Sequence, residues 1–189
     1  METASSRTLL FDKALMDTAI LSVAQSIVSE YSPKDIPRLA FIGIQLRGVP
    51  FTERLVKIIG KLTESTPEIG TLDITMYRDD IGMRKALPVI YETKIPFDIN
   101  DRIIILVDDV LHTGRTIRAA LDAITDYGRP SYIKLAALID RGMREFPITA
   151  DYVGKTCILS GEKRIRVSWT ETDDEDAVYQ IEKKTQGTK

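Results

Sequence analysis

The chain of 189 residues contains one cysteine, Cys157, so no disulfide can form within it. Disulfide frameworks stabilise small proteins in oxidising compartments and are rare where thiols are kept reduced. The sequence also has no apolar stretch of membrane-spanning length, and residues 1 to 10 lack the apolar core of a signal peptide. These absences favour a soluble cytoplasmic protein.

Positive and negative charges nearly balance, because the sequence has 26 lysines and arginines and 28 acidic residues, a formal net charge of −2. Any RNA contact would therefore have to come from a local basic patch. The sequence has no internal repeats, no low-complexity tracts and no P-loop motif. Its length suits one domain with a proper core, which we take as residues 1–189.

One stretch, residues 103–116, combines the features of a binding site. It opens with five apolar residues, four of them β-branched, which predict a strand covered on both faces. Asp108 and Asp109 follow this run, and a short polar turn containing Gly114 comes next. The turn leads into an apolar stripe with helical spacing, formed by Ile117, Ala120, Leu121 and Ile124.

The polar turn lies where a helix is expected to begin, and a helix N-terminus presents unpaired N–H groups and a partial positive charge that hold phosphate. The hydroxyl groups of Thr113 and Thr116 can bind the same anion, while Gly114 lets the backbone approach without a Cβ in the way. Carboxylates beside such a cradle repel a bare phosphate but accept hydrogen bonds from sugar hydroxyls. The pattern therefore predicts a site for a ribose 5-phosphate.

Other α/β proteins also end an apolar strand in two acids, so the motif alone leaves alternatives open. A receiver domain gathers acids at strand ends, but its acid pair comes early in the chain. Phosphatases of the haloacid dehalogenase type need Asp-x-Asp, and Val110 occupies the second of these positions counted from Asp108. The flanking segments are needed to decide between the alternatives.

The stretch VDDVLHTGRT resembles the signature of type I phosphoribosyltransferases, which bind 5-phosphoribosyl-1-pyrophosphate (PRPP). Further segments are similar to one group of these enzymes, the PyrR family of pyrimidine operon attenuators and uracil phosphoribosyltransferases. These segments are residues 43–48, 73–80, 95–99 and 128–142, together with the run REFPITADYVGK that follows. The resemblance covers nearly the whole chain, about residues 12–169.

The resemblance implies the type I phosphoribosyltransferase fold, a mostly parallel α/β sheet flanked by helices, with a small cap, or hood, and a mobile flap loop. It implies the reaction of uracil with PRPP to give UMP and pyrophosphate, and UMP-responsive binding of the leader mRNA of a pyrimidine biosynthesis operon. Mg²⁺ is expected to accompany PRPP rather than to occupy a cage of protein side chains. A homo-oligomer, a dimer or larger, is usual in the family.

One of the two functions alone is also compatible with the sequence. The chain could be a phosphoribosyltransferase without RNA-binding regulation, or a regulator that senses UMP or PRPP and has negligible enzyme activity. Arg144 and Lys155 are the candidates for RNA contacts. They lie in residues 140–166, a segment that contains six basic and four acidic residues. Family members often have His in place of Met143 and Arg in place of Thr149. A solvated face of ion pairs is the alternative.

By the same resemblance, Asp108 and Asp109 bind the ribose hydroxyls and Arg78 meets the pyrophosphate, so these three are the expected catalytic residues. The loop before Pro50 is expected to wrap the pyrophosphate with backbone N–H groups and a strained peptide bond near Arg47. The alternative is an ordinary turn with a solvated arginine. The residues expected to bind PRPP or the nucleotide are Leu46, Arg47, Gly48, Lys85, Val110, His112, Thr113, Gly114, Arg115 and Thr116.

Family members commonly have Thr in place of Leu46, a change that removes a hydroxyl but leaves the backbone contacts. Residues 81–93 show no sustained periodicity, which is typical of a lid or a linker. The resemblance makes this segment the flap over PRPP and Lys85 a candidate for contact with the pyrophosphate. A solvated linker is the alternative.

The strand predicted over residues 132–139 ends in charge, at the edge where open α/β sheets bind ligands. The resemblance implies that backbone groups of Ile139, Asp140 and Arg141 frame the uracil ring. An ion pair that closes the strand would explain the same residues. His112 is expected to be a packing or loop residue rather than a catalytic base.

The rest of the pattern predicts the neighbouring elements. We expect a helix capped by Asp12 that ends before Ser32, a strand over residues 39–44 and a helix beginning near Pro50. A half-buried strand is expected over residues 73–77, and an edge strand of the cap over residues 164–169. Residues 1–11 are interpreted as a loose lead-in, residues 170–189 as peripheral, and the run ETDDED as a solvated acidic stretch.

Overall fold

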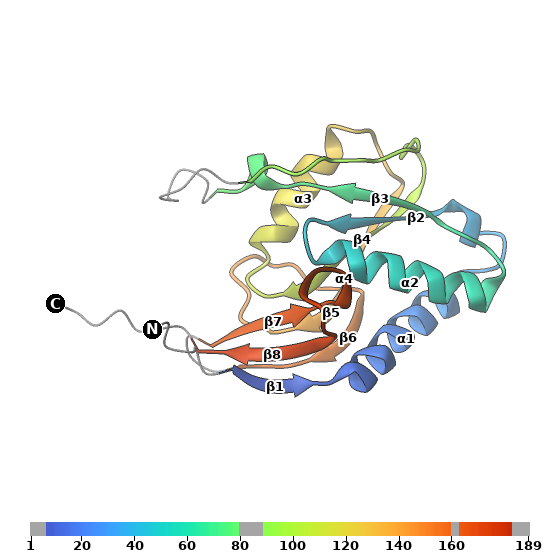
Figure 1. Cartoon of the computed structure of the whole chain (residues 1–189). Coiled ribbons are helices and arrows are strands. Elements are labelled where there is room, and N and C mark those ends of the chain that lie inside the picture. Colours follow the sequence, from blue (N-terminus) through green and yellow to red (C-terminus); the bar gives the residue numbers. More distant parts are fainter. Residues whose placement is uncertain (1–6, 80–88, 160–162, 183–189) are drawn as a thin grey trace.

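A computed structural model describes residues 7–79, 89–159 and 163–182, which form two sheets and their flanking helices (Figure 1). The large sheet consists of β2 (Leu39–Ile44), β3 (Glu68–Leu72), β4 (Ile103–Leu111), β5 (Tyr132–Asp140) and β6 (Tyr152–Thr156). The small sheet consists of β1 (Arg7–Phe11), β7 (Arg164–Ser168) and β8 (Ala177–Ile181), and together with Lys163 and residues 169–176 it is called the cap below. The helices are α1 (Lys13–Glu30), α2 (Gly48–Thr63), α3 (Arg115–Thr125) and the short α4 (Thr170–Asp173), with 3₁₀ turns η1 (Ile36–Arg38) and η2 (Thr75–Tyr77).

The large sheet is parallel throughout, with the strand order β3-β2-β4-β5-β6. Its central strand β4 is apolar on both faces because it lies between two cores. Ile103, Ile105 and Val107 pack into the core that α1 and α2 cover. Ile104 and Leu106 pack into the core on the opposite face, which α3 covers. Figure 1 shows α1 and α2 on one side of this sheet and α3 on the other.

Several predicted elements are confirmed. The side chain of Asp12 accepts a hydrogen bond from the Leu15 N–H at 2.9 Å and so caps α1, which ends at Glu30. Strand β2 has the predicted bounds, β5 is one residue longer than predicted, and β7 is an edge strand of the cap. Among the residues that the structure describes, no helix combines the length and the apolar character needed to cross a membrane.

Strand β4 continues beyond its apolar run, so Asp108 and Asp109 lie inside the strand rather than after it. Asp108 pairs with Ala137 of β5, and Val110 pairs with Ile139. The ladder to β5 therefore holds the two carboxylates on regular backbone. Their strand-end position was predicted, but the length of the strand was not.

The prediction of a strand over residues 73–77 was wrong. Strand β3 ends at Leu72, and Asp73 Oδ1 then accepts hydrogen bonds from the backbone N–H and the hydroxyl of Thr75, at 2.7 and 2.5 Å. A short acid that binds the backbone two residues further on folds the chain into a turn. The alternation of polar and apolar residues in this segment thus belongs to the 3₁₀ turn η2.

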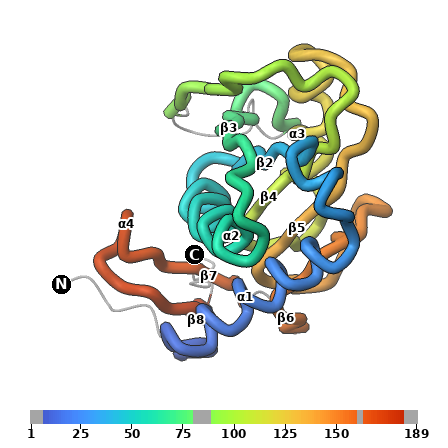
Figure 2. Tube along the Cα trace, turned by 90° about the vertical axis from the view of Figure 1, so that its right-hand side faces the viewer, coloured from blue at the N-terminus to red at the C-terminus, as the bar shows by residue number. Residues whose placement is uncertain are grey.

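The expectation of a loose lead-in is corrected for residues 7–11, which form β1 and pair with β8, the middle strand of the cap. The ETDDED run is not solvated throughout, because the side chains of Asp173 and Asp176 are 10% and 4% exposed and form ion pairs with Arg47 and Arg54. Figure 2 shows the cap to one side of the layer formed by α1 and α2.

Candidate active site

Two carboxylates lie together near the carboxyl end of β4. Asp108 is 7% exposed, and its Oδ1 accepts a hydrogen bond from the backbone N–H of Asp109 at 3.0 Å. Burial raises the pKa of Asp108 well above its ordinary value, and the charge of Asp109 raises it further. Burial also raises the pKa of Asp109. The pair is therefore stabilised by a ligand that donates hydrogen bonds, as sugar hydroxyls do.

The loop before α2 lies directly against this strand end. At Gly48 a Cβ would lie 2.5 Å from the carbonyl oxygen of Val107 and 3.3 Å from the Cα of Asp108. Only glycine permits so close an approach, which explains the residue at this position. The peptide bond between Gln45 and Leu46 is cis, and both residues line the cavity beside the two acids.

Arg47 belongs to the same loop and joins it to the cap. Its Nε donates to the carbonyl oxygen of Val167 at 2.6 Å, and its Nη2 donates to Asp173 at 2.8 Å. Arg47 lines a cavity of about 360 Å³ together with Asp108 and Asp109, and we call this the acid cavity. The side chain is only 31% exposed, so the alternative of a solvated arginine in an ordinary turn does not describe it.

A second cavity of about 210 Å³ surrounds the start of α3, and we call it the turn cavity. It is lined by the chain from Leu111 to Ile117 and by Arg78, whose Nη1 donates to the Thr116 hydroxyl at 3.5 Å. Gly114 precedes the helix with φ of +90°, a conformation that favours glycine. The helix N-terminus, the hydroxyls and the arginine together have the character of an anion site.

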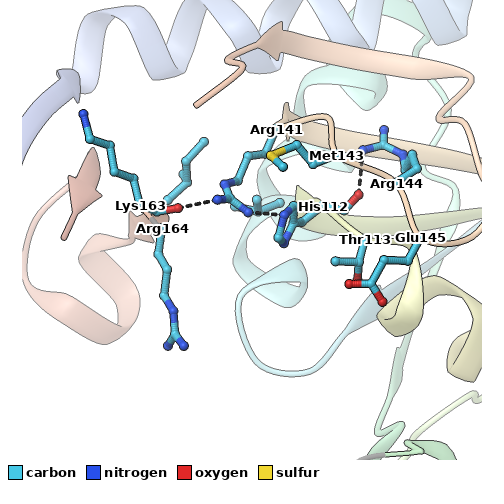
Figure 3. Close-up of a pocket in the computed structure, with 10 residues that line it drawn as sticks. His112, Thr113, Arg141, Met143, Arg144, Glu145, Lys163 and Arg164 are labelled. Carbon is cyan, nitrogen blue, oxygen red and sulfur yellow. Dashed lines mark hydrogen bonds between the residues drawn. The ribbon is translucent and has the colours of Figure 1, made fainter. Parts of the chain in front are cut away.

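A third cavity of about 720 Å³, the cap cavity, lies between the end of β5 and the start of β7 (Figure 3). Figure 3 shows the guanidinium of Arg141 between the ring of His112 and the carbonyl oxygen of Lys163, both of which it contacts. Burial and the charge of Arg141 lower the pKa of His112, so the ring is neutral near pH 7. Within the described residues, Arg141 Nε is buried without a hydrogen-bond partner. Such a donor suits a ligand that brings an acceptor.

The three cavities share residues and therefore adjoin one another. Val110 lines all of them, Arg78, Asp108 and Thr116 line both the acid and the turn cavity, and His112 lines both the turn and the cap cavity. The shared residues connect the loop at Arg47, past the acid pair, to the cap. A ligand with a phosphorylated sugar in the middle and one group on each side fits this arrangement.

The three residues expected around the base lie in different surroundings. The side chain of Ile139 is completely buried in the core. Asp140 pairs with Arg144 at 2.7 Å, and the backbone N–H of Arg141 donates to the carbonyl oxygen of Leu111 at 2.9 Å. Of the three, only Arg141 lines the cap cavity, and its backbone N–H is already engaged.

The remaining predicted residues differ in what their side chains contact. Arg144 donates to the carbonyl oxygens of His112 and Ile148 at 2.7 and 2.8 Å, so it braces the loop after β5 instead of extending into solvent as expected for an RNA contact. Arg115 forms ion pairs with Asp79 and Glu145. Lys155 is exposed on β6. Lys85 and most of the expected flap lie outside the described residues.

Two acids near the site were not predicted. Asp73 lines the acid cavity and accepts a hydrogen bond from the Tyr91 N–H at 2.5 Å, and Asp173 binds Arg47. A sequence signal existed for the second, because Arg47 and Arg54 lie seven residues apart, about two helical turns, and an acidic run occurs later in the chain. Nothing in the sequence identified which acid meets which arginine.

The acid cavity fits a metal ion that arrives with a phosphate ligand. Among the described residues, no group of three or more His, Cys, Asp or Glu side chains could hold a metal ion. Asp108 and Asp109 nevertheless offer carboxylate oxygens to this cavity. Mg²⁺ keeps several waters and takes one or two carboxylates beside the phosphate oxygens of a substrate. The donor set therefore suits Mg²⁺ held largely by its ligand.

Comparison with known proteins gives consistent matches over most of the chain. The family model of the phosphoribosyl transferase domain matches residues 11–175. A protein named bifunctional protein PyrR from Roseiflexus sp. is 48% identical over 155 residues, which are 82% of this chain and 84% of that protein. Another of the same name, from Pelotomaculum thermopropionicum, is 44% identical over 173 residues, covering 92% of this chain and 94% of that protein.

Solved structures with the same architecture include hypoxanthine phosphoribosyltransferase of Trypanosoma cruzi, with a TM-score of 0.71, 18% identity, and coverage of 93% of this chain and 96% of that one. A hypoxanthine-guanine phosphoribosyltransferase from Bacillus anthracis has a TM-score of 0.66 at 18% identity, covering 96% of this chain and 99% of that one. Identities this low show a shared fold alone. They confirm the predicted type I phosphoribosyltransferase fold and do not bear on the base.

Proposed function

The chain belongs to the phosphoribosyl transferase domain family and, within it, to the PyrR proteins, and from this membership we propose that it is a uracil phosphoribosyltransferase. The reaction joins the ribose 5-phosphate of PRPP to uracil, giving UMP and pyrophosphate. The observation that carries the proposal is the convergence of the acid pair, the turn before α3 and the loop before α2 on adjoining cavities.

The ligand occupies the three cavities in one order. The 5′-phosphate binds in the turn cavity, where the α3 N-terminus supplies N–H groups and Thr116 a hydroxyl. The ribose hydroxyls donate to Asp108 and Asp109, and the pyrophosphate lies in the acid cavity with Arg47 and Arg78. The base lies in the cap cavity, where Arg141 Nε is a donor that needs an acceptor.

Catalysis then consists of positioning and electrostatic stabilisation. The bond between ribose C1 and the pyrophosphate breaks while a ring nitrogen of the base approaches, so positive charge develops on the sugar and negative charge on the leaving group. The carboxylates of Asp108 and Asp109 lie beside the sugar, and the guanidinium groups of Arg47 and Arg78 lie beside the pyrophosphate. This distribution of charge favours the transition state without a protein nucleophile.

We propose that Mg²⁺ enters with PRPP and that Asp108 and Asp109 are the residues nearest to it. When bound, the ion neutralises charge on the pyrophosphate oxygens. The protein contributes oxygen acceptors at the ribose and cationic donors at the pyrophosphate.

The enzyme proposal is tested with the double variant Asp108→Asn and Asp109→Asn. Both replacements keep the size of the side chains but remove charged acceptors of the ribose hydroxyls, so uracil-dependent release of pyrophosphate should fall by at least about 10²-fold. Asp122→Asn, an exposed acid on α3, is the matched control and should leave turnover unchanged. Unaltered turnover in the double variant would contradict the site assignment. A panel of bases assayed with the wild-type protein tests the choice of uracil.

We also propose the regulatory function, binding of pyrimidine operon leader mRNA in response to UMP. It is favoured by the name of the relatives, bifunctional protein PyrR, and by the position of cations in this chain. Lys163 and Arg164 line the cap cavity, where the nucleotide base would bind, and Arg164 is exposed there. Lys155 is exposed on β6, where it pairs with Ile139 of β5. A cytoplasmic homo-oligomer would repeat this cationic surface.

A further inference from the structure

An acidic segment that contains α4, residues 169–176, contacts one face of the first two turns of α2. Arg47, Phe51 and Arg54 follow each other at intervals of four and three residues, so they share a face of the helix. The rings of Phe51 and Trp169 are stacked, with centroids 6.2 Å apart and an interplanar angle of 12°. Arg54 pairs with Glu171 and Asp176, each at 2.6 Å, while Arg47 binds Asp173.

The guanidinium of Arg47 is only partly used by the cap. Nε donates to the Val167 carbonyl oxygen at 2.6 Å, and Nη2 donates to both carboxylate oxygens of Asp173, at 2.8 and 3.1 Å. Over the described parts of the chain, Nη1 makes no hydrogen bond, although Arg47 lines the acid cavity. The charge of Arg47 acts on Asp109, whose pKa it lowers against the effect of burial. The cap therefore fixes two of the three guanidinium nitrogens, while Nη1 has no hydrogen-bond partner among the described residues.

Asp173 is itself fixed by the cap. Its carboxylate accepts hydrogen bonds from Arg166 Nη2 at 2.8 Å, from the Thr172 hydroxyl at 2.9 Å and from the Trp169 N–H at 3.2 Å. The side chain is 10% exposed. A carboxylate with so many donors has one orientation, and it transmits that orientation to the planar guanidinium bound to it.

We propose that Asp173 is a positioning residue for the pyrophosphate of PRPP, because it orients Arg47 so that Nη1 points at the pyrophosphate in the acid cavity. The inference rests on the proposed function and adds a role for the cap in recognising the leaving group. It distinguishes two ligands of the same site. PRPP carries the pyrophosphate that Arg47 meets, whereas UMP has none and leaves the acid cavity without a phosphate.

The test compares Asp173→Asn with the wild-type protein by calorimetric titration of PRPP with Mg²⁺, in the absence of uracil, and of UMP. An amide presents a donor to Arg47 in place of one acceptor, so the guanidinium loses its fixed orientation. We expect PRPP to bind about ten- to a hundredfold more weakly, the usual effect of losing one hydrogen bond to a charged group. UMP should bind within about twofold of the wild type. In turnover, KM for PRPP should rise more than kcat falls.

Two further variants separate positioning from general damage to the cap. Glu171→Gln removes an acid of the same segment that pairs with Arg54 and not with Arg47, so it should leave the affinity for PRPP unchanged. In the background of Arg47→Ala, adding Asp173→Asn should weaken PRPP no further, because the two residues act as a unit.

The outcomes distinguish this inference from the function on which it rests. Unchanged or tighter PRPP binding by the folded Asp173→Asn variant would overturn it, as would an equal loss of affinity for PRPP and UMP. Additive losses in the double variant would also contradict it. If the wild-type protein failed to bind PRPP, the proposed function would fall, and this inference with it.

Discussion

The carboxyl group of Asp108 belongs to the candidate site, and its burial destabilises the folded protein. Its carboxyl group is buried beside a second acid, and the charge of Arg78 does not compensate, since the pKa of Asp108 stays well above its ordinary value. A carboxyl group with a raised pKa in the folded state binds more protons folded than unfolded. Its contribution to stability therefore falls as the pH rises from the unfolded pKa, 3.8, toward the folded one.

We expect Asp108→Asn to stabilise the unliganded protein at pH 8 while it impairs turnover. The amide keeps the acceptor for the Asp109 N–H but carries no charge to desolvate. The free energy of unfolding should increase by about 1 kcal/mol or more at pH 8, which is roughly 3 °C in Tm. The increase should disappear near pH 4, where the Asp108 carboxyl of the folded wild type is as uncharged as the amide of the variant. Thermal unfolding of the variant and the wild type from pH 4 to 8 measures it. A Tm difference that does not change with pH would contradict the explanation.

The start of α2 packs so closely against the end of β4 that no residue larger than glycine fits at position 48. A Cβ on Gly48 would meet the Val107 carbonyl oxygen at 2.5 Å, so α2 or the end of β4 must move in Gly48→Ala. We expect a loss of about 1–3 kcal/mol in the free energy of unfolding and a higher KM for PRPP, because the loop carrying Arg47 is displaced. Urea unfolding and initial rates measure the two effects.

Gly60→Ala is the matched control in the same helix. A Cβ there approaches only the Ser65 carbonyl oxygen, at 3.4 Å, and alanine favours a helix over glycine by about 1 kcal/mol. This variant should therefore be as stable as the wild type or more stable, with unchanged KM. If both variants behaved alike, the close approach at Gly48 would not be the cause.

The acidic segment after β7 gives the cap a dependence on pH. Burial raises the pKa of Asp173, but hydrogen bonds from Arg166 and Thr172 outweigh it and lower the value from 3.8 to about 2. A lowered carboxyl pKa contributes stability above the unfolded pKa, and that contribution is lost as the pH falls from about 3.8 to about 2. The shift corresponds to about 2 kcal/mol.

We expect acid to loosen the cap over this range, and Trp169 can report it because it is the only tryptophan and is completely buried on Phe51. Its fluorescence should change between pH 4 and 2 in the wild type. In Asp173→Asn the same change should begin at higher pH or be present already at pH 4. Identical titrations of the two proteins would show that Asp173 does not govern the docking of the cap.

Elements were predictable from the sequence where burial alone decides their form. The apolar runs of β2 and β4 and the stripe of α3 have one reasonable interpretation, and the acids of β4 follow from strand direction. The turn at Asp73 was missed because a side-chain hydrogen bond closes it. The ion pairs of Asp173 and Asp176 were not predicted, because their partners Arg47 and Arg54 lie more than 100 residues earlier in the chain. Pairings over such distances depend on the whole fold.

For the whole molecule, the candidate site lies where the two sheets meet. The large sheet supplies the acid pair and the helix start, while the cap supplies Lys163, Arg164 and the acid that holds Arg47. A ligand that fills the cavities contacts both sheets, so we expect its binding to affect how the cap lies. This gives a physical route by which UMP can alter a surface that includes cations of the cap.

A chain of net charge −2 can bind RNA, a polyanion, only through a local basic patch. Affinity for a leader RNA hairpin should rise with UMP and fall steeply with salt, as counterions are released from phosphates. Lys155→Ala should reduce the slope of log K against log salt by about 1, whereas Lys57→Ala, exposed on α2, should leave it unchanged. Filter binding measures both. If no RNA hairpin is preferred at any UMP concentration, the regulatory proposal fails and only the enzyme proposal remains.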